Sequence, residues 1–257
     1  GHASPDGVDV YNAIAYYMRD MTRARFLPAV CLAVTLASPL SAQRHAMTSD
    51  DLALEKGVSD PRLSPDGHRL VYVRTSTNYA TDSITNEIVI VDLESGKPTL
   101  TFPSAMSPRW SPDGRTIAFA AGPGIGLLDV ASKTAHGLVA VAQTDNWTGS
   151  GTIKNFAWSP DGSWIAYVGA EAPRAAGAPA SDVRAYSRIM YKTRTGFSDD
   201  RRTHIWVVPV RGGDPRLLTP GDHDEHSLSW SPDGRRIAFV SDRSPDPDNA
   251  YHNDLWT

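Results

Sequence analysis

A five-residue pattern recurs four times along the chain and constrains the fold more than any other feature of the sequence. It reads Leu-Ser-Pro-Asp-Gly at 63–67 and Trp-Ser-Pro-Asp-Gly at 110–114, 158–162 and 230–234, with spacings of 47, 48 and 72 residues. Recurrence of one pattern at a nearly fixed period is typical of repeat architectures, in which each copy is one structural unit.

The residues of the pattern suit a type I turn that closes a β-hairpin. The serine hydroxyl caps the turn, proline presets φ near −65°, aspartate tolerates the bridge region, and glycine takes the left-handed conformation. We therefore assign the turns to 64–67, 111–114, 159–162 and 231–234. Their structural residues are Pro65, Asp66, Gly67, Pro112, Asp113, Gly114, Pro160, Asp161, Gly162, Pro232, Asp233 and Gly234.

Each turn is followed by apolar runs that predict further strands. The first run lies at 70–73, 117–120, 165–168 and 237–240, and it is apolar at nearly every position, which indicates a strand covered on both faces. A third strand is predicted at 88–92, 125–129 and 205–209, and a short fourth strand at 99–102, 136–139 and 216–218. Four antiparallel strands recurring about every 48 residues describe the blade of a β-propeller, here with WD40-like repeats.

The number of repeats predicts an all-β fold in the form of an open, incomplete β-propeller. Residues 60–257 hold about 3.6 blades once the extra length of the third unit is set aside, whereas closed propellers have about four to eight. We expect this chain to be a truncated fragment of a longer protein, preceded by a segment at 44–59 that leads into the first blade.

The N-terminal part of the chain has the features of a targeting signal. From Met21, Arg23 and Arg25 precede an apolar stretch that ends before Ser41 and Ala42, which is the layout of a secretory signal peptide. We assign the signal peptide to 21–43 and interpret 1–20 as an upstream extension outside the native structure. The protein is expected to be periplasmic or secreted, with no stable membrane span after signal cleavage.

Charge and cysteine content exclude several classes of function. A formal net charge of −4, without a dense run of Lys or Arg, argues against nucleic acid as a partner. The single cysteine, Cys31, lies within the predicted signal peptide, so thiol catalysis and zinc–thiolate sites are excluded. The acidic and histidine-rich stretch 222–226 lacks the helical His pair of a zinc peptidase. We interpret it as a solvated loop, and we expect no metal site and no cofactor.

Four segments resemble one family of enzymes. They are 47–52 (MTSDDL), 58–67 (VSDPRLSPDG), 201–208 (RRTHIWVV) and 212–219 (GGDPRLLT). They are similar to the N-terminal propeller of secreted bacterial serine peptidases of the prolyl oligopeptidase family, especially the acylaminoacyl-peptidase and dipeptidyl-peptidase-like branch. The resemblance spans 47–257. The repeated pentapeptide alone is less specific, since TolB-like periplasmic propellers share it.

The resemblance implies a function that the chain serves only in part. In that family the propeller filters access to a C-terminal α/β-hydrolase domain, which carries a Ser-Asp-His triad and hydrolyses short peptides. The chain has no G-x-S-x-G nucleophile elbow, and Gly149-Ser150-Gly151 has the wrong glycine spacing. We therefore assign no catalytic residue and expect the hydrolase domain to be the missing partner. The alternatives are a TolB-like periplasmic interaction propeller, or a propeller fused to a different hydrolase such as an amidohydrolase.

The extra length of the third unit is the best candidate for a functional element. The insertion covers about 171–200 and becomes basic and aromatic in its second half. Its candidate residues for substrate gating or interdomain contact are Arg184, Tyr186, Arg188, Tyr191 and Arg194. Arginines bind carboxylates and carbonyls well, although an additional hairpin with a solvated charged face also fits this composition.

Overall fold

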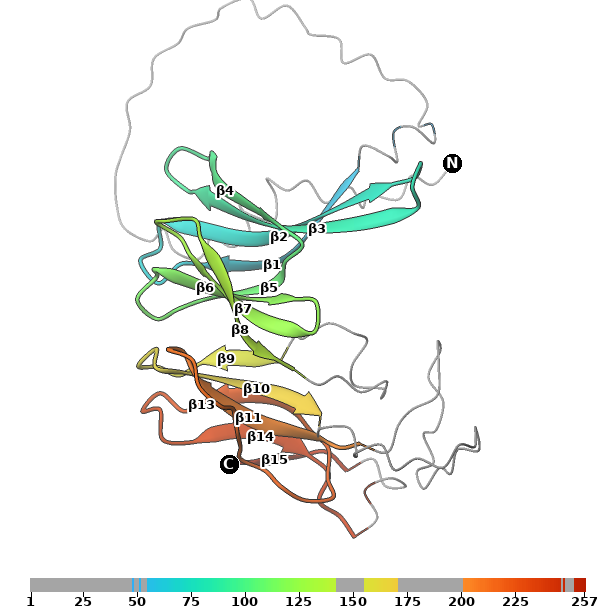
Figure 1. Ribbon diagram of the computed structural model, residues 1–257, viewed down its shortest axis with the longest axis vertical. Coiled ribbons are helices and arrows are strands. Elements are labelled where there is room, and N and C mark those ends of the chain that lie inside the picture. Colours follow the sequence, from blue (N-terminus) through green and yellow to red (C-terminus); the bar gives the residue numbers. More distant parts are fainter. Residues whose placement is uncertain are drawn as a thin grey trace, which may run out of the picture. The chain divides into compact units, whose positions relative to one another are not determined.

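The computed structural model describes residues 48, 51, 55–141, 155–170, 201–245, 247 and 252–257. The chain divides into two units, 1–46 and 47–257, and the described residues all belong to the second. Their regular structure consists of strands in four antiparallel sheets (Figure 1). Within the described residues, no helix is long and apolar enough to cross a membrane.

Each repeat of the sequence forms one sheet. The first contains β1 (Lys56–Leu63), β2 (Arg69–Asn78), β3 (Ser83–Asp92) and β4 (Pro98–Pro103), and the second β5 (Met106–Trp110), β6 (Thr116–Ala121), β7 (Gly124–Asp129) and β8 (Ala135–Ala140). The third contains β9 (Phe156–Trp158), β10 (Trp164–Ala170), β11 (Thr203–Pro209) and β12 (Arg216–Leu217), and the fourth β13 (Glu225–Trp230), β14 (Ile237–Ser241) and β15 (Asp254–Trp256). In every sheet the strands follow one another in sequence order. This arrangement confirms the prediction of an open, partial propeller.

The predicted turns form and share one hydrogen-bond pattern. In each turn the serine hydroxyl donates to the aspartate Oδ1 at 2.5–2.6 Å, and the same Oδ1 accepts a backbone N–H two residues further on at 3.0–3.1 Å. The four turn glycines have φ between 69° and 76°, which disfavours a side chain. The serine hydrogen bond is the main cause that lowers the pKa of Asp66 and of Asp161 to about 2.

Tryptophan side chains connect each sheet to the one before it. The indole N–H of Trp110 donates to the carbonyl of Arg62 at 3.1 Å, and that of Trp158 donates to the carbonyl of Arg109 at 3.0 Å. Trp230 repeats the contact on Ala157 at 3.2 Å. The tryptophan of the repeated pentapeptide therefore fixes the first strand of one sheet against the first strand of the preceding sheet.

The cores lie between neighbouring sheets. The buried residues between the first and second sheets are Val71, Ile88, Ile90, Ala105, Ile117, Phe119 and Leu128. Those between the second and third are Ala118, Ala120, Ile125, Leu127, Val141, Phe156, Ile165, Tyr167 and Val208. Successive residues of β6 thus face opposite neighbours, which explains why the strand is apolar at consecutive positions.

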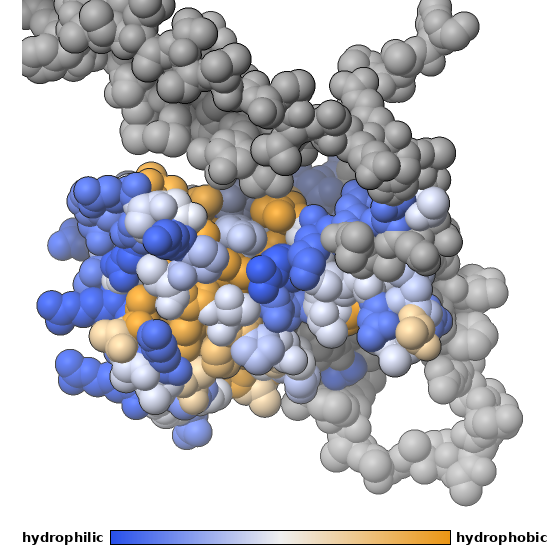
Figure 2. Space-filling model, turned by 90° about the horizontal axis from the view of Figure 1, so that it is seen from above, coloured by the Kyte–Doolittle hydropathy of each residue, from blue (hydrophilic) through white to orange (hydrophobic). Residues whose placement is uncertain are grey.

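The outer face of the first sheet shows where the stack is open. By position in the repeat, Leu70 and Tyr72 correspond to Ile117 and Phe119, whose side chains are buried against the preceding sheet. Leu70 and Tyr72 are instead only partly buried, and Leu63, which stands where the other repeats have Trp, is 47% exposed. Apolar side chains extend across the surface that Figure 2 views from above. The first sheet thus presents a blade-packing face without a neighbouring sheet among the described residues.

The two ends of the sheets differ in their connections. One end, the corner end, carries the Ser-Pro-Asp-Gly turns and the turns between third and fourth strands, and each of these connections has five or six residues. Because antiparallel strands alternate in direction, all other connections lie at the opposite end, the loop end. Its long connections are 141–155, 171–202, 218–224 and 242–253. The connections that differ in length from one repeat to the next therefore lie at the loop end.

Candidate functional site

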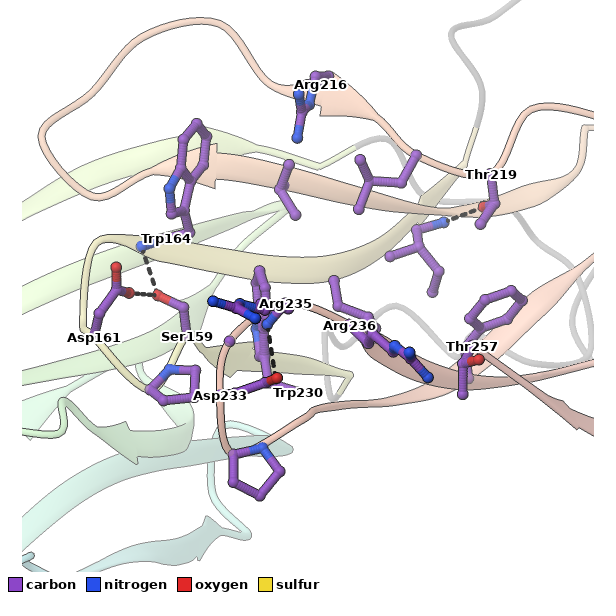
Figure 3. Close-up of a pocket in the computed structure, with 18 of the residues that line it drawn as sticks. Ser159, Asp161, Trp164, Arg216, Thr219, Trp230, Asp233, Arg235, Arg236 and Thr257 are labelled. Atoms are coloured by element: carbon purple, nitrogen blue, oxygen red, sulfur yellow. Dashed lines mark hydrogen bonds between the residues drawn. The ribbon is translucent and has the colours of Figure 1, made fainter.

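A groove of about 1140 Å³ runs between the third and fourth sheets (Figure 3). Apolar side chains from β11 and β14 line its interior, namely Ile205, Val207, Ile237 and Phe239. The groove reaches from the turn at Ser159–Asp161 to Thr219 and Arg243 near the loop end. Ile237 in this groove is only partly buried, whereas the equivalent Ile117 and Ile165 are completely buried.

Arginines give the corner end of this groove a positive charge. Arg216, Arg235 and Arg236 are exposed, line the groove, and form no ion pair with another described residue. The nearby carboxylates of Asp161 and Asp233 accept hydrogen bonds within their own turns. Exposed guanidinium groups that form no ion pair are suited to bind carboxylate or carbonyl oxygens.

At the loop end of the groove, a buried carboxylate collects three donors. Glu225 is 1% exposed, and its Oε2 lies 2.9 Å from Nδ1 of the fully buried His204. The Thr219 hydroxyl donates to the same oxygen at 3.1 Å, and Arg243 Nη2 donates to Oε1 at 3.1 Å. These four residues come from β11, from the connection before β13, from β13 and from the connection after β14, so one carboxylate holds two sheets together.

A second ion-pair group lies beside it. Arg202 Nε donates to Asp222 Oδ1 at 2.8 Å, and Arg202 Nη1 donates to Asp224 Oδ2 at 3.1 Å. The backbone N–H of Thr203 donates to Asp224 Oδ1 at 2.9 Å. Arg202 ends the connection 171–202 and Thr203 begins β11, whereas both aspartates lie in the connection 218–224. The ion pairs therefore fasten the base of the third-sheet insertion to the neighbouring loop.

The contacts of this charged cluster indicate a structural role for its carboxylates. Both oxygens of Glu225 are occupied by donors, and Arg243 also lies over the rings of Phe239 and Trp256 at 5.3 and 5.0 Å. Burial lowers the pKa of His226, against the opposing charges of Asp224 and Glu225. Among the described residues, no group of three or more His, Cys, Asp or Glu side chains is arranged to hold a metal ion.

The structure corrects one sequence-based interpretation and leaves another untested. The prediction of a solvated loop at 222–226 holds for Asp222, whose side chain is 90% exposed, but it is wrong for Glu225, which begins β13 and is buried. Its ion-pair partners lie 18 to 21 residues away in sequence, too far for a local pattern to indicate them. The candidate residues Arg184, Tyr186, Arg188, Tyr191 and Arg194 lie outside the described residues.

Sequence reasoning also missed His204, Thr219 and Arg243. Two signals could have revealed His204 and Arg243. Thr203 and His204 are polar residues at the start of an otherwise apolar strand, and Arg243 follows closely after the apolar run of β14. Polar residues at such strand ends are expected to have a partner on a neighbouring element.

Comparisons with known proteins agree with this architecture. A scan against protein-family models finds no match. The chain is 27% identical over 224 residues to a protein of Bacillus subtilis described as uncharacterized peptidase YuxL, covering 83% of this chain and 34% of that protein. The chain thus spans about a third of the length of this curated relative.

Solved structures of acylaminoacyl peptidases share the fold. One, in complex with Z-Gly-Gly-Phe-chloromethyl ketone, matches with a TM-score of 0.61 and 22% identity over 80% of this chain and 32% of that one. The acylaminoacyl peptidase of Pyrococcus horikoshii matches with a TM-score of 0.60 and 23% identity over the same shares. In sequence and in fold, the chain is similar to the β-propeller portion of peptidases of the prolyl oligopeptidase family.

Proposed function

We propose that this chain is the non-catalytic propeller portion of an exported serine peptidase that hydrolyses short peptides. In this role the propeller restricts which peptides reach an α/β-hydrolase domain carried elsewhere in the parent protein. The resemblance of the quoted segments to this peptidase family and the similarity to a curated peptidase support the proposal. Export from the cell rests on the predicted signal peptide at 21–43.

The observation that carries the gating role is the difference between the two ends of the sheets. The corner end repeats one short turn, whereas the loop end carries the long connections and the buried ion-pair cluster. Binding residues of repeat proteins commonly gather on the face that holds the insertions. We therefore propose that peptides meet the propeller at the loop end, where Arg184, Arg188 and Arg194 contact a peptide or the hydrolase domain.

The experiment uses the full-length protein encoded by the gene that contains this chain. A fluorophosphonate probe should label one serine outside 1–257, and peptides of increasing length should be hydrolysed with falling kcat/KM. Replacing Arg184, Arg188 and Arg194 together by Gln should change that length dependence while leaving labelling by the small probe intact. Labelling unchanged together with an unchanged length dependence would exclude these arginines from gating.

The alternative is a TolB-like periplasmic interaction propeller or a propeller fused to another hydrolase, such as an amidohydrolase. The continuation of the gene separates the two possibilities. Further blades followed by G-x-S-x-G and later Asp and His residues support the peptidase. Blade closure followed by a stop codon, with no labelling by the probe, supports the interaction module.

A further inference from the structure

The hairpin formed by β2 and β3 is longer than its counterparts. Both strands have ten residues, whereas β6 and β7 of the next sheet have six each. Pairing is continuous up to Asn78 opposite Ser83. The additional residues lie at the loop end, so the tip of this hairpin extends beyond the neighbouring sheet (Figure 1).

Side-chain contacts across the two strands hold the projecting part in shape. Arg74 and Glu87 form an ion pair at 2.6 Å, with both side chains partly buried, and Thr75 donates to the Asn86 side chain at 2.8 Å. At the turn, the Asn78 side-chain oxygen accepts two backbone N–H groups at 3.0 and 3.3 Å. Cross-strand pairs of this kind stabilise a hairpin, so the tip is an ordered element.

One edge of this ordered tip has no strand beside it. β4 pairs with β3 only from Glu87 to Val91, so the segment Ser83–Asn86 pairs with β2 alone among the described residues. Near the tip, the side chains of Ile84 and Tyr79 are 67% and 62% exposed. Proteins usually protect a free edge with a charge, a proline or a bulge, and Ser-Ile-Thr-Asn contains none of these.

We propose that this free edge of β3 binds the same edge of a second copy of the protein. Two identical strands pair antiparallel about a two-fold axis, and such an interface satisfies both copies at once. With Ile84 opposite Ile84, Ser83 lies opposite Thr85 and Asp82 opposite Asn86. No like charges face each other in this register, and the two exposed isoleucines cover one another. This proposal is independent of the peptidase function.

The interface is small, which sets the strength of the association. About four residues of each strand are available, and this is less than the contact of a standard-sized, stable complex. The dimer is therefore weak, and its population rises with protein concentration.

The test measures sedimentation of the full-length protein over a range of concentrations. Ile84→Lys brings two like charges together at the centre of the interface, and Ile84→Pro removes the Ile84 backbone N–H, which faces the free edge because alternate residues of β3 bond to β2. Each variant is expected to raise the dimer dissociation constant at least tenfold, whereas Ile84→Val leaves it within about twofold. Ile84→Cys should form an interchain disulfide with copper phenanthroline, and Arg211→Cys, in an exposed turn at the corner end, should not.

Three results would overturn the proposal. The first is sedimentation as a monomer at every concentration. The second is a dimer whose dissociation constant is the same in the Ile84→Lys variant as in the unsubstituted protein. The third is slow amide hydrogen exchange of Ile84 at dilutions where the protein is monomeric, because another part of the same chain would then cover the edge.

Discussion

The interface between the second and third sheets and the interface between the third and fourth are built from the same repeat but are filled differently. Ile165 is completely buried in the apolar core between the second and third sheets, as the equivalent Ile117 is between the first and second. The next equivalent, Ile237, lines a groove that ends at the ion-pair cluster around Glu225. The tryptophan hydrogen bond is nevertheless present in both interfaces.

This difference separates two roles of the repeated sequence. The pentapeptide makes the same turn in every sheet, and its tryptophan, present in the second, third and fourth repeats, makes the same contact with the preceding sheet each time. The residues between the sheets then decide whether an interface is a packed apolar core or a polar contact. A buried ion pair contributes less to stability than good apolar packing of similar volume, but removing one partner is costly. The third interface is therefore the one most sensitive to a single polar substitution.

The largest effect is expected for Glu225→Ala. This change leaves His204 and Arg243 buried or partly buried without their carboxylate, and breaking such a pair costs about 3–5 kcal/mol. Urea unfolding of the full-length protein measures the loss. Hydrogen exchange should rise in β13 and β14 and remain unchanged in β2 and β3. Glu94→Ala, in an exposed turn, is the control and should shift stability by less than about 0.5 kcal/mol.

A uniform rise in exchange across all four sheets after Glu225→Ala would contradict the comparison. It would mean that the interface between the third and fourth sheets opens cooperatively with the two interfaces before it. The ion pairs could then not be treated as a separate contact.

Gly126→Ala tests the packed interfaces and should have the next largest effect. A Cβ at this position would lie 2.6 Å from Cζ of Phe119, whose ring packs edge-on against Phe102 at 5.1 Å between centroids. Forcing an extra methyl into a packed core costs about 1–3 kcal/mol. Gly137→Ala is a matched control in the neighbouring strand, because nothing lies within 4 Å of its Cβ. Equal stability of the two variants would show that this core is loosely packed.

The sequence predicted the repeated part of this structure far better than the charged part. The turns could be predicted from the pentapeptide, because each of its residues has a local conformational reason to be there. The apolar second strands follow each pentapeptide, and the number of repeats indicated a propeller with too few sheets to close. The cluster around Glu225 depends on residues distant in sequence, so the stretch 222–226 read locally as a solvated loop. The long hairpin of β2 and β3 was also underestimated, since the sequence of its tip is mostly polar apart from Tyr79 and Ile84 and carries no apolar periodicity.

Trp158→Phe should have a smaller effect than Gly126→Ala. Phenylalanine keeps most of the ring packing and loses the hydrogen bond to the Arg109 carbonyl, which is worth about 1 kcal/mol. Trp230→Phe should cost about the same, because its bond to the Ala157 carbonyl is equivalent although its interface is not. Urea midpoints of the two variants give the comparison. A clear difference between them would show that the tryptophan contact depends on what surrounds it.

The smallest expected effect is a pH dependence that distinguishes the fourth sheet from the others. Burial lowers the pKa of His226 below its ordinary value of 6.5, so the folded state binds its proton less well than the unfolded state. Its contribution to stability is therefore complete above about pH 6.5 and is lost as the pH falls through the lower folded pKa.

The turn aspartates act in a different range. The pKa of Asp66 and of Asp161 is about 2, below the ordinary 3.8, so their contribution is lost only between about pH 4 and pH 2. Hydrogen exchange in β13 and β14 should thus accelerate as the pH falls below about 6.5, after correction for intrinsic rates, while β5 and β6 stay constant. His226→Gln should abolish this acceleration. If it persists in the variant, His226 is not its cause.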